Sequence, residues 1–351
     1  MYFSNRKYKE DLKNTYDSSV GIERLSNKKI LITGATGLIG SFLVDFCLFL
    51  NEIYDYKIQI YVLGRDEDRL KTRFQSHIEN NRLHFIIQDV VLPLMLESEL
   101  DYIIQAAGDG FPAAFREHPV ETMTPAFIGT YNLLEAARKL NVKRFMYISS
   151  GEIYGKSKKQ EHAFKEDEPG IIDSMQVRSC YPIAKKAAET LCVSFSQEYG
   201  IDTVIATPGH TYGLAVSSSD NRATVQFMND ALNGRDIVLY SPGLQMRSYT
   251  YISDCASALL TVLLQGNNMK VYNIANSDSK VTIAEFARIL SEVAGVGYEI
   301  RLPDEAQQKE LTPIEYAVLD SSKLESLGWK GKYGIRAGIE QMYQMAMLDR
   351  V

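Results

Sequence analysis

The sequence predicts an α/β fold: a doubly wound parallel sheet with a smaller, interleaved C-terminal lobe. Short β-rich runs alternate with helical stretches between residues 29 and 206, which is typical of a parallel sheet covered by helices on both faces. A glycine-rich turn stands directly between the first β-rich run and the first helical stretch. After Pro208 the alternation loosens into a segment rich in Gly, Ser, Asn and Asp, residues 209–255, which indicates a second lobe.

The individual elements follow from the hydrophobic periodicity of the chain. Strands are predicted at 29–33, 56–63, 83–89, 102–106, 144–149, 202–206 and 271–275. Helices are predicted at 7–16, 41–51, 67–80, 121–140, 184–199, 256–265, 282–294 and 334–347. Because each strand in the first part is followed by a helix, successive strands are expected to be parallel neighbours in one sheet.

Composition excludes several classes of protein. The chain has 351 residues, 45% of them hydrophobic, and a formal net charge of −6. This composition suits a globular protein and argues against nucleic acid or an anionic membrane as the main partner. The longest apolar run, 46–50, is too short to span a membrane. Cys47, Cys180, Cys192 and Cys255 form neither a C-x-x-C pair nor a metal-ligand pattern with histidine. We therefore expect free thiols, no metal and a cytoplasmic location.

The glycine-rich turn has the form G-x-x-G-x-x-G. Gly34 permits a tight turn, Gly37 lets the backbone approach a pyrophosphate, and Gly40 lets the helix lie close to the strand. Amides at the helix N-terminus then face the anion. The turn predicts a dinucleotide site formed by Gly34, Thr36, Gly37, Leu38, Ile39 and Gly40.

A second motif, Y-x-x-x-K, is formed by Tyr181 and Lys185 at the start of a predicted helix. Residues four apart share one face of a helix. A nearby ammonium group favours the ionised form of a phenol, so Tyr181 is expected to act as a base well below the ordinary pKa of tyrosine.

Together these motifs resemble the extended short-chain dehydrogenases/reductases, and residues 28–330 resemble the NAD-dependent epimerase/dehydratase family. The resemblance implies a Rossmann fold, a bound NAD that is recycled, and a nucleoside-diphosphate sugar as substrate. It places a catalytic hydroxyl at Ser150. Arg65, after the second predicted strand, makes NADP the alternative cofactor, because an arginine there accommodates a 2′-phosphate. Further cofactor contacts are expected at Asp89, Val90, Ala106, Ala107, Gly108, Tyr181, Lys185 and Pro208.

The resemblance also suggests how the chain is divided. Residues 1–27 are interpreted as an N-terminal extension and 28–208 as the dinucleotide-binding Rossmann domain. Residues 209–351 are mainly a substrate-binding lobe, from which about 235–275 return to the Rossmann domain. Members of this family usually form homodimers through two long helices, here expected at about 119–140 and 181–198.

Glu152 distinguishes the candidate reactions. The resemblance is to enzymes that oxidise C4 of a nucleotide-linked hexose, and a C4 ketone makes the C5 proton acidic. It also turns a C5 carboxylate into a β-keto acid, so an acid–base residue near C5 assists elimination or decarboxylation. The segments Ser150-Gly151-Glu152 and Arg178-Ser179-Cys180-Tyr181 resemble UDP-glucuronate decarboxylases. The 4,6-dehydratases instead carry Asp-Glu at positions 151–152.

Other residues are expected to hold the sugar nucleotide. Guanidinium groups suit a diphosphate. His210 stands where the family usually has Asn, and Thr207 where it has Arg. Residues 108–112 depart from the family pattern, so Asp109, Phe111 and Arg116 are expected to set the sugar preference. The predicted substrate contacts are Asp109, Ser150, Gly151, Glu152, His210, Arg222 and Arg247.

The sequence therefore favours decarboxylation of a nucleotide-linked uronic acid, with Ser150, Glu152, Tyr181 and Lys185 as catalytic residues. A 4,6-dehydratase is the next alternative and an epimerase the third. A plain reductase with net NADPH turnover and a non-catalytic dinucleotide-sensing protein remain as alternatives from other classes.

Overall fold

A computed structural model describes residues 5–108, 110–156, 162–214, 220–301 and 314–348. Its centre is a seven-stranded parallel sheet with the order β10-β6-β5-β4-β1-β2-β3. This is the strand order of a doubly wound Rossmann sheet with one further strand at the edge, so the predicted fold class is confirmed. The strands are β1 (Lys29–Thr33), β2 (Gln59–Gly64), β3 (Leu83–Ile87), β4 (Tyr102–Gln105), β5 (Arg144–Ile148), β6 (Thr203–Pro208) and β10 (Lys270–Ile274).

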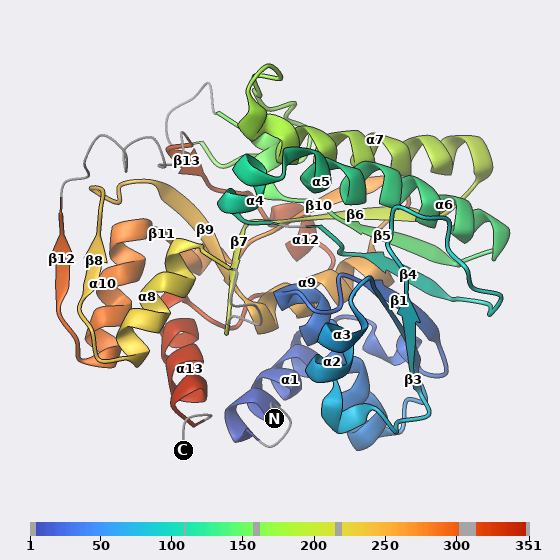
Figure 1. Ribbon diagram of the computed structural model, residues 1–351, viewed down its shortest axis with the longest axis horizontal. Coiled ribbons are helices and arrows are strands. Elements are labelled where there is room, and N and C mark those ends of the chain that lie inside the picture. The colour runs from blue at the N-terminus through green and yellow to red at the C-terminus, as the bar shows by residue number, and fades with distance from the viewer. Residues whose placement is uncertain (1–4, 109, 157–161, 215–219, 302–313, 349–351) are drawn as a thin grey trace.

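Helices cover both faces of this sheet, and each face has its own hydrophobic core (Figure 1). Successive side chains of a strand point to opposite faces: Ile30 and Ile32 of β1 belong to one core and Leu31 to the other. The first core contains residues of α1 (Arg6–Ser18), α2 (Leu38–Tyr54) and α9 (Ile252–Gln265). The second contains residues of α6 (Thr130–Lys139) and α7 (Cys180–Tyr199).

Two helices differ from their predicted extents. The helix expected at 121–140 consists of α5 (Pro119–Thr124), a π-helical turn at Pro125–Gly129, and α6. Pro125 lacks the amide proton that a regular helix needs, which accounts for the altered turn. The helix expected at 67–80 ends early, since α3 spans Glu67–Arg73 and is followed by a 3₁₀ turn.

The second lobe is built on short strands. β9 (Met246–Tyr251) pairs with β7 (His210–Tyr212), β11 (Lys280–Thr282) and β13 (Tyr316–Ala317). A separate pair is formed by β8 (Ile237–Leu239) and β12 (Tyr298–Ile300). The accompanying helices are α8 (Ala223–Leu232), α10 (Ile283–Ala294) and α13 (Ile335–Leu348), while α12 (Ser322–Glu325) lies beside β10.

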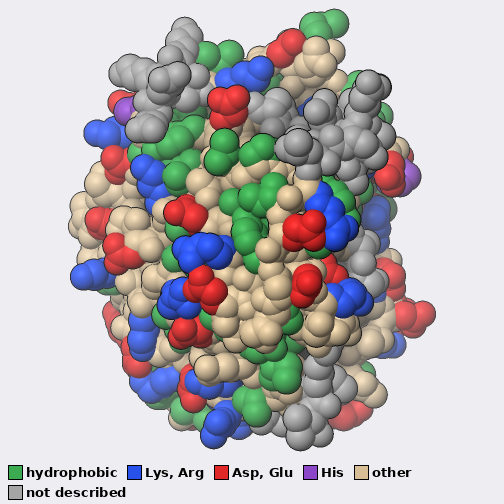
Figure 2. All heavy atoms as spheres, turned by 90° about the vertical axis from the view of Figure 1, so that its left-hand side faces the viewer, with side chains coloured by type: hydrophobic (Ala, Val, Ile, Leu, Met, Phe, Trp, Pro, Cys, Tyr) green, Lys and Arg blue, Asp and Glu red, His purple; other side chains and the backbone are tan. Residues whose placement is uncertain are grey.

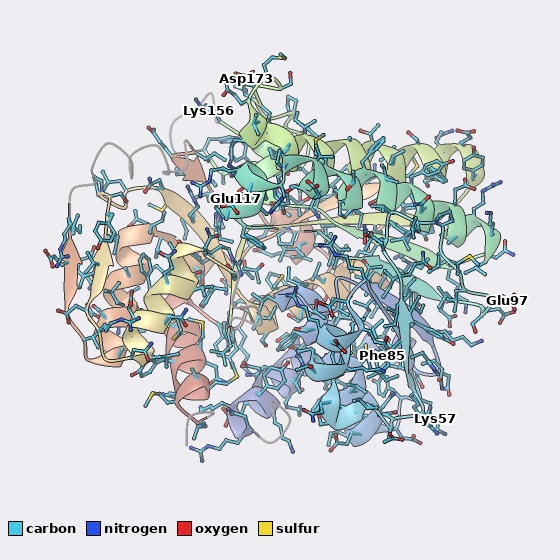
Figure 3. All side chains as sticks on the ribbon, in the orientation of Figure 1. Lys57, Phe85, Glu97, Glu117, Lys156 and Asp173 are labelled. Atoms are coloured by element: carbon cyan, nitrogen blue, oxygen red, sulfur yellow. The ribbon has the colours of Figure 1, made fainter. Side chains whose placement is uncertain are left out.

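Residues 235–275 are shared between the two parts of the molecule. β8 and β9 pair inside the small sheets, whereas α9 and β10 pack on and extend the large one. The chain therefore returns to the large sheet at Ile252, later than position 235. Lys57 and Glu97 mark the end of the Rossmann domain farthest from the second lobe (Figure 3). On the outer face of the second lobe, basic and acidic side chains are interspersed (Figure 2).

The N-terminal segment is part of the folded core. Asp11 of α1 is fully buried and accepts hydrogen bonds from Tyr251 Oη at 2.6 Å and Gln341 Nε2 at 3.0 Å. Burial raises the pKa of Asp11 to about 7. Through these contacts α1 joins β9 to α13. In the described residues, no helix is both long enough and apolar enough to cross a membrane.

Candidate active site

A cleft of about 410 Å³ lies at the carboxyl ends of β1, β4, β5 and β6, between the sheet and the second lobe. Doubly wound sheets bind their ligands at this edge. Many of the residues predicted from the sequence meet there. Those that line the cleft are Gly34, Gly37, Leu38, Ile39, Gly40, Ala106, Gly108, Ser150, Gly151, Glu152, Tyr181, Lys185, Pro208, His210, Arg222 and Arg247.

Some predicted cofactor residues lie outside the cleft lining, and their binding roles stay predictions. Val90 is buried in the hydrophobic core under α6. The amide of Ala107 donates to Thr33 Oγ1 at 3.1 Å. Asp109 lies outside the described residues. The predicted residues that do not line the cleft are Thr36, Arg65, Asp89, Val90 and Ala107.

The glycine-rich turn is shaped by close backbone packing. Gly34 has a φ of +64°, and a Cβ placed on it would lie 2.5 Å from Ala106 O. A Cβ on Gly40 would lie 2.3 Å from Gly34 O, so α2 can approach the strand only without a side chain there. No side chain caps the N-terminus of α2, and its first residues line the cleft. The turn thus fits a pyrophosphate, because uncapped amides face the space a ligand would take.

Tyr181 and Lys185 both face the cleft from α7. Lys185 Nζ donates to Ile148 O at 2.8 Å and lies 5.8 Å from the centroid of the Tyr181 ring. Burial raises the pKa of Tyr181 to about 12, and a hydrogen bond with Ser150 opposes that rise. Burial lowers the pKa of Lys185 to about 8. The expectation of a depressed Tyr181 pKa is therefore wrong for this arrangement, because burial of the phenol outweighs the charges around it.

Glu152 forms an ion pair with Arg178 at the cleft. It is the second residue of a 3₁₀ turn, Gly151–Tyr154, that follows β5, and its amide donates to Ser150 Oγ at 3.3 Å. Its carboxylate is paired with Arg178, whose Nη2 lies 2.9 Å from Oε1 and 2.8 Å from Oε2. Arg178 comes from a second 3₁₀ turn, Val177–Ser179, directly before α7. The side chains of Ser150, Glu152, Arg178 and Tyr181 thus form one group.

Phe115 of α4 (Pro112–Glu117) supports this group from below the cleft surface. Its ring is 1% exposed and stacks on the Tyr181 ring, with centroids 4.6 Å apart and an interplanar angle of 18°. The guanidinium of Arg178 lies 4.6 Å from the centroid of the same ring. Phe115 therefore fixes Tyr181 and Arg178 relative to each other.

The second lobe contributes the basic end of the cleft. Arg247 is 2% exposed and donates to Met246 O, Ile314 O and Glu315 O at 2.9, 2.6 and 3.3 Å. In the described residues no carboxylate lies within 4.0 Å of this guanidinium, so its charge is available to an anion. Arg222 is paired with Asp220. The pKa of His210 is lowered to about 3 by burial and by both arginines, so its imidazole is neutral.

Sequence reasoning missed several residues that line or support the cleft. Arg69 of α3 lines it near the glycine-rich turn, and Tyr249 lines it beside Arg247. The signal for Arg178 is its place three residues before Tyr181. Nothing local in the sequence pointed to Phe115, since its role depends on contacts with residues more than sixty positions away. Arg116, by contrast, is exposed and does not line the cleft.

Arg65, the residue predicted to decide between NAD and NADP, is open to solvent. The Arg65 side chain is 69% exposed and lies 3.9 Å from Asp89. Asp66 accepts a hydrogen bond from Arg69 N at 2.9 Å and caps α3. Its carboxylate is therefore engaged by the backbone. Within the described residues, no group of three or more His, Cys, Asp or Glu could hold a metal ion.

The chain is similar to known enzymes that act on nucleotide sugars. A UDP-glucuronic acid decarboxylase of Arabidopsis thaliana is 33% identical over 321 residues, covering 90% of this chain and 88% of its own. A dTDP-glucose 4,6-dehydratase from Streptomyces venezuelae, solved with NAD bound, has a TM-score of 0.77 at 21% identity and covers 92% of this chain and 98% of its own. A UDP-glucuronic acid 4-epimerase from Bacillus cereus, solved with UDP-glucuronic acid and NAD, has a TM-score of 0.74 at 23% identity, covering 91% and 99%.

The similarity to the two solved structures agrees with the α/β fold of the central sheet. The family model for the NAD dependent epimerase/dehydratase family matches residues 30–275, which hold most of the cleft lining. The chain belongs to the NAD dependent epimerase/dehydratase family.

Proposed function

We propose that this protein decarboxylates a nucleoside-diphosphate-linked uronic acid, with UDP-glucuronic acid as the first candidate, using bound NAD. The observation that carries the proposal is the grouping of Ser150, Glu152, Arg178 and Tyr181 in one cleft. The similarity to a UDP-glucuronic acid decarboxylase over 90% of the chain supports it.

The residues around the glycine-rich turn fit a dinucleotide. We expect the pyrophosphate at the amides of Gly37–Gly40 and the nicotinamide end near Lys185, with NADP as the alternative because of Arg65. When bound, NAD supplies the reversible oxidation of C4 and, as a cation, favours ionisation of the Tyr181 phenol.

Tyr181 and Ser150 then act on the C4 oxygen of the sugar. The Tyr181 phenolate, whose formation bound NAD would favour, takes up the O4 proton, while Ser150, which is hydrogen-bonded to Tyr181, orients that oxygen. Loss of CO₂ from the β-keto acid leaves negative charge on the same C4 oxygen. The two hydroxyl groups stabilise that charge by donating hydrogen bonds to it. We expect Glu152, two residues after Ser150, to move a proton at C5.

The basic end of the cleft suits the diphosphate. Arg247 and Arg222 line the second-lobe side, and the neutral His210 between them offers a hydrogen bond without a charge. The arginines belong to a different lobe than Tyr181. We therefore expect one lobe to bind the diphosphate and the other to bind the reacting sugar.

The test is to incubate the purified protein with a panel of nucleotide sugars and to analyse the products by mass spectrometry. We expect the mass of CO₂ to be lost from UDP-glucuronic acid, without net consumption of NAD. Loss of water from a hexose would show a 4,6-dehydratase, the second candidate, in which Glu152 assists elimination at C5. An unchanged mass with a new retention time would show an epimerase. Stoichiometric cofactor consumption would show a reductase, and an inert protein with bound dinucleotide a sensing role.

We also propose a homodimer formed through α5, α6 and α7. Large apolar side chains are exposed along these helices, including Val120, Phe127, Ile128, Tyr131 and Tyr199 at 65, 43, 43, 46 and 44% exposure. Such a patch marks an interface. Light scattering after gel filtration should give twice the chain mass, and Phe127→Glu should give the single-chain mass. Ile53→Glu, at a 54% exposed site on α2, is the matched control and should stay dimeric.

We finally propose that the protein works in the cytoplasm. All four cysteines are free and buried, as is typical of proteins kept in a reducing compartment. Localisation of a tagged chain by cell fractionation checks this proposal.

A further inference from the structure

Arg178 holds donors that the folded chain does not use. Only its Nη2 contacts Glu152. In the described part of the chain, neither Nε nor Nη1 has a hydrogen-bond acceptor, although a guanidinium carries five N–H donors. On the other side of the pair, Glu152 Oε2 is buried and accepts no hydrogen bond of good geometry in the described residues. Two residues that line the cleft therefore keep hydrogen-bonding capacity that the folded chain does not use.

Three other cations of the cleft already have hydrogen-bond or ion-pair partners. Lys185 donates to Ile148 O, Arg222 is held by Asp220, and Arg247 is wedged against three carbonyls in the second lobe. Arg178 lies beside Tyr181 because both pack on Phe115. If Tyr181 faces O4 of the sugar, the substituent on C5 comes next to Arg178, since C4 and C5 are directly bonded.

We propose that Arg178 binds the C5 carboxylate of the substrate, and that this contact makes the cleft selective for nucleotide-linked uronic acids over neutral hexoses. The inference rests on the proposed function for the orientation of the sugar. A guanidinium is suited to a carboxylate through paired hydrogen bonds. A neutral C5 hydroxymethyl group would leave those donors unmatched in a partly buried site, which weakens binding.

The ion pair with Glu152 also reduces the positive charge that Arg178 presents to the substrate carboxylate. Decarboxylation moves negative charge from the carboxylate to the C4 oxygen, so a free cation on the carboxylate would stabilise the ground state and slow the reaction. Because Glu152 already offsets the charge of Arg178, the carboxylate is oriented by hydrogen bonds without strong charge stabilisation. Arg178 is thus a substrate-binding residue, and Glu152 limits its effective charge.

The test is a binding measurement that needs no turnover. In a Tyr181→Phe background, calorimetry compares UDP-glucuronic acid with UDP-glucose in the presence of NAD. We expect the uronate to bind about tenfold more tightly or better, in line with a charge-assisted hydrogen bond. Arg178→Gln removes the positive charge and most of the donors, so it should abolish this preference and leave UDP-glucose affinity within about twofold, because the proposed contact is made to the C5 carboxylate alone. Arg178→Lys should keep a smaller preference.

Two controls keep the test decisive. Arg116→Gln removes an exposed cation of α4 that does not line the cleft, and it should keep the full preference. Melting temperatures check that each variant folds; should Arg178→Gln unfold, Arg178→Lys carries the comparison alone. An intact preference in Arg178→Gln, or equal weakening for both ligands, would overturn the inference even if the protein decarboxylates. Conversely, an Arg178-dependent preference in a protein that does not decarboxylate would leave the inference standing and overturn the proposed function.

Discussion

The two ends of the cleft are built by different means. At the end proposed for the dinucleotide, Gly34 and Gly40 bring backbone against backbone, and a single methyl group would collide with carbonyl oxygens. At the end proposed for the sugar, ion pairing and stacking on Phe115 bring together Ser150, Glu152, Arg178 and Tyr181. A site made of backbone is fixed by local sequence and admits little change, whereas a site made of side chains can alter its chemistry while the fold stays the same.

The largest effect is expected at the backbone-built end. Gly40→Ala places a Cβ 2.3 Å from Gly34 O, so α2 must move away from the strand. We expect a loss of roughly 3 kcal/mol in unfolding free energy and no measurable dinucleotide binding. Denaturant titration and dinucleotide fluorescence check this. Gly37→Ala is the control, because its Cβ would meet only Gly34 O at 3.3 Å among the described neighbours. Equal losses of stability in Gly40→Ala and Gly37→Ala would contradict the view that close backbone packing at Gly40 holds the turn in place.

A smaller effect is expected from titration of Lys185. Its pKa is about 8 in the folded protein and 10.5 when unperturbed. Between these values the unfolded chain holds the proton and the folded chain does not, so this residue makes the folded state more stable as pH rises. The difference in unfolding free energy between wild type and Lys185→Met should increase by about 1 kcal/mol per pH unit from pH 8 to 10. A difference that stays constant over this range would refute the lowered pKa.

The smallest effect on NAD is expected at Arg65, which is 69% exposed. Arg65→Ser should change NAD affinity by less than about threefold, since exposed charges contribute little. It should weaken NADP more strongly, because the 2′-phosphate loses its cation. Calorimetric titration with both dinucleotides measures this; Lys71→Ser, on the following helix α3 and paired with Glu67, is the control. Equal weakening of both dinucleotides would mean that Arg65 does not select the cofactor.

Much of the fold was accessible from the sequence because its signals are local. The alternation of β-rich runs and helical stretches predicted the parallel sheet, and β1, β5 and β6 lie close to their expected positions. Pro125 shows where such reasoning stops: the hydrophobic pattern continues through it, while the missing amide changes the helix to a π turn. The N-terminal segment shows another limit. It reads as a polar extension, yet Asp11 is buried by partners on β9 and α13.

The sequence by itself determined the order of the elements, the glycine-rich turn and the Tyr181/Lys185 pair, because turn geometry and helical spacing act over a few residues. Only the tertiary structure decided that Arg178 pairs with Glu152, that Phe115 holds Arg178 and Tyr181 together, and that burial sets the pKa values of Tyr181 and Lys185. The physical reason is that burial and ion pairing depend on residues distant in the chain. Their strength is set by the water that folding excludes.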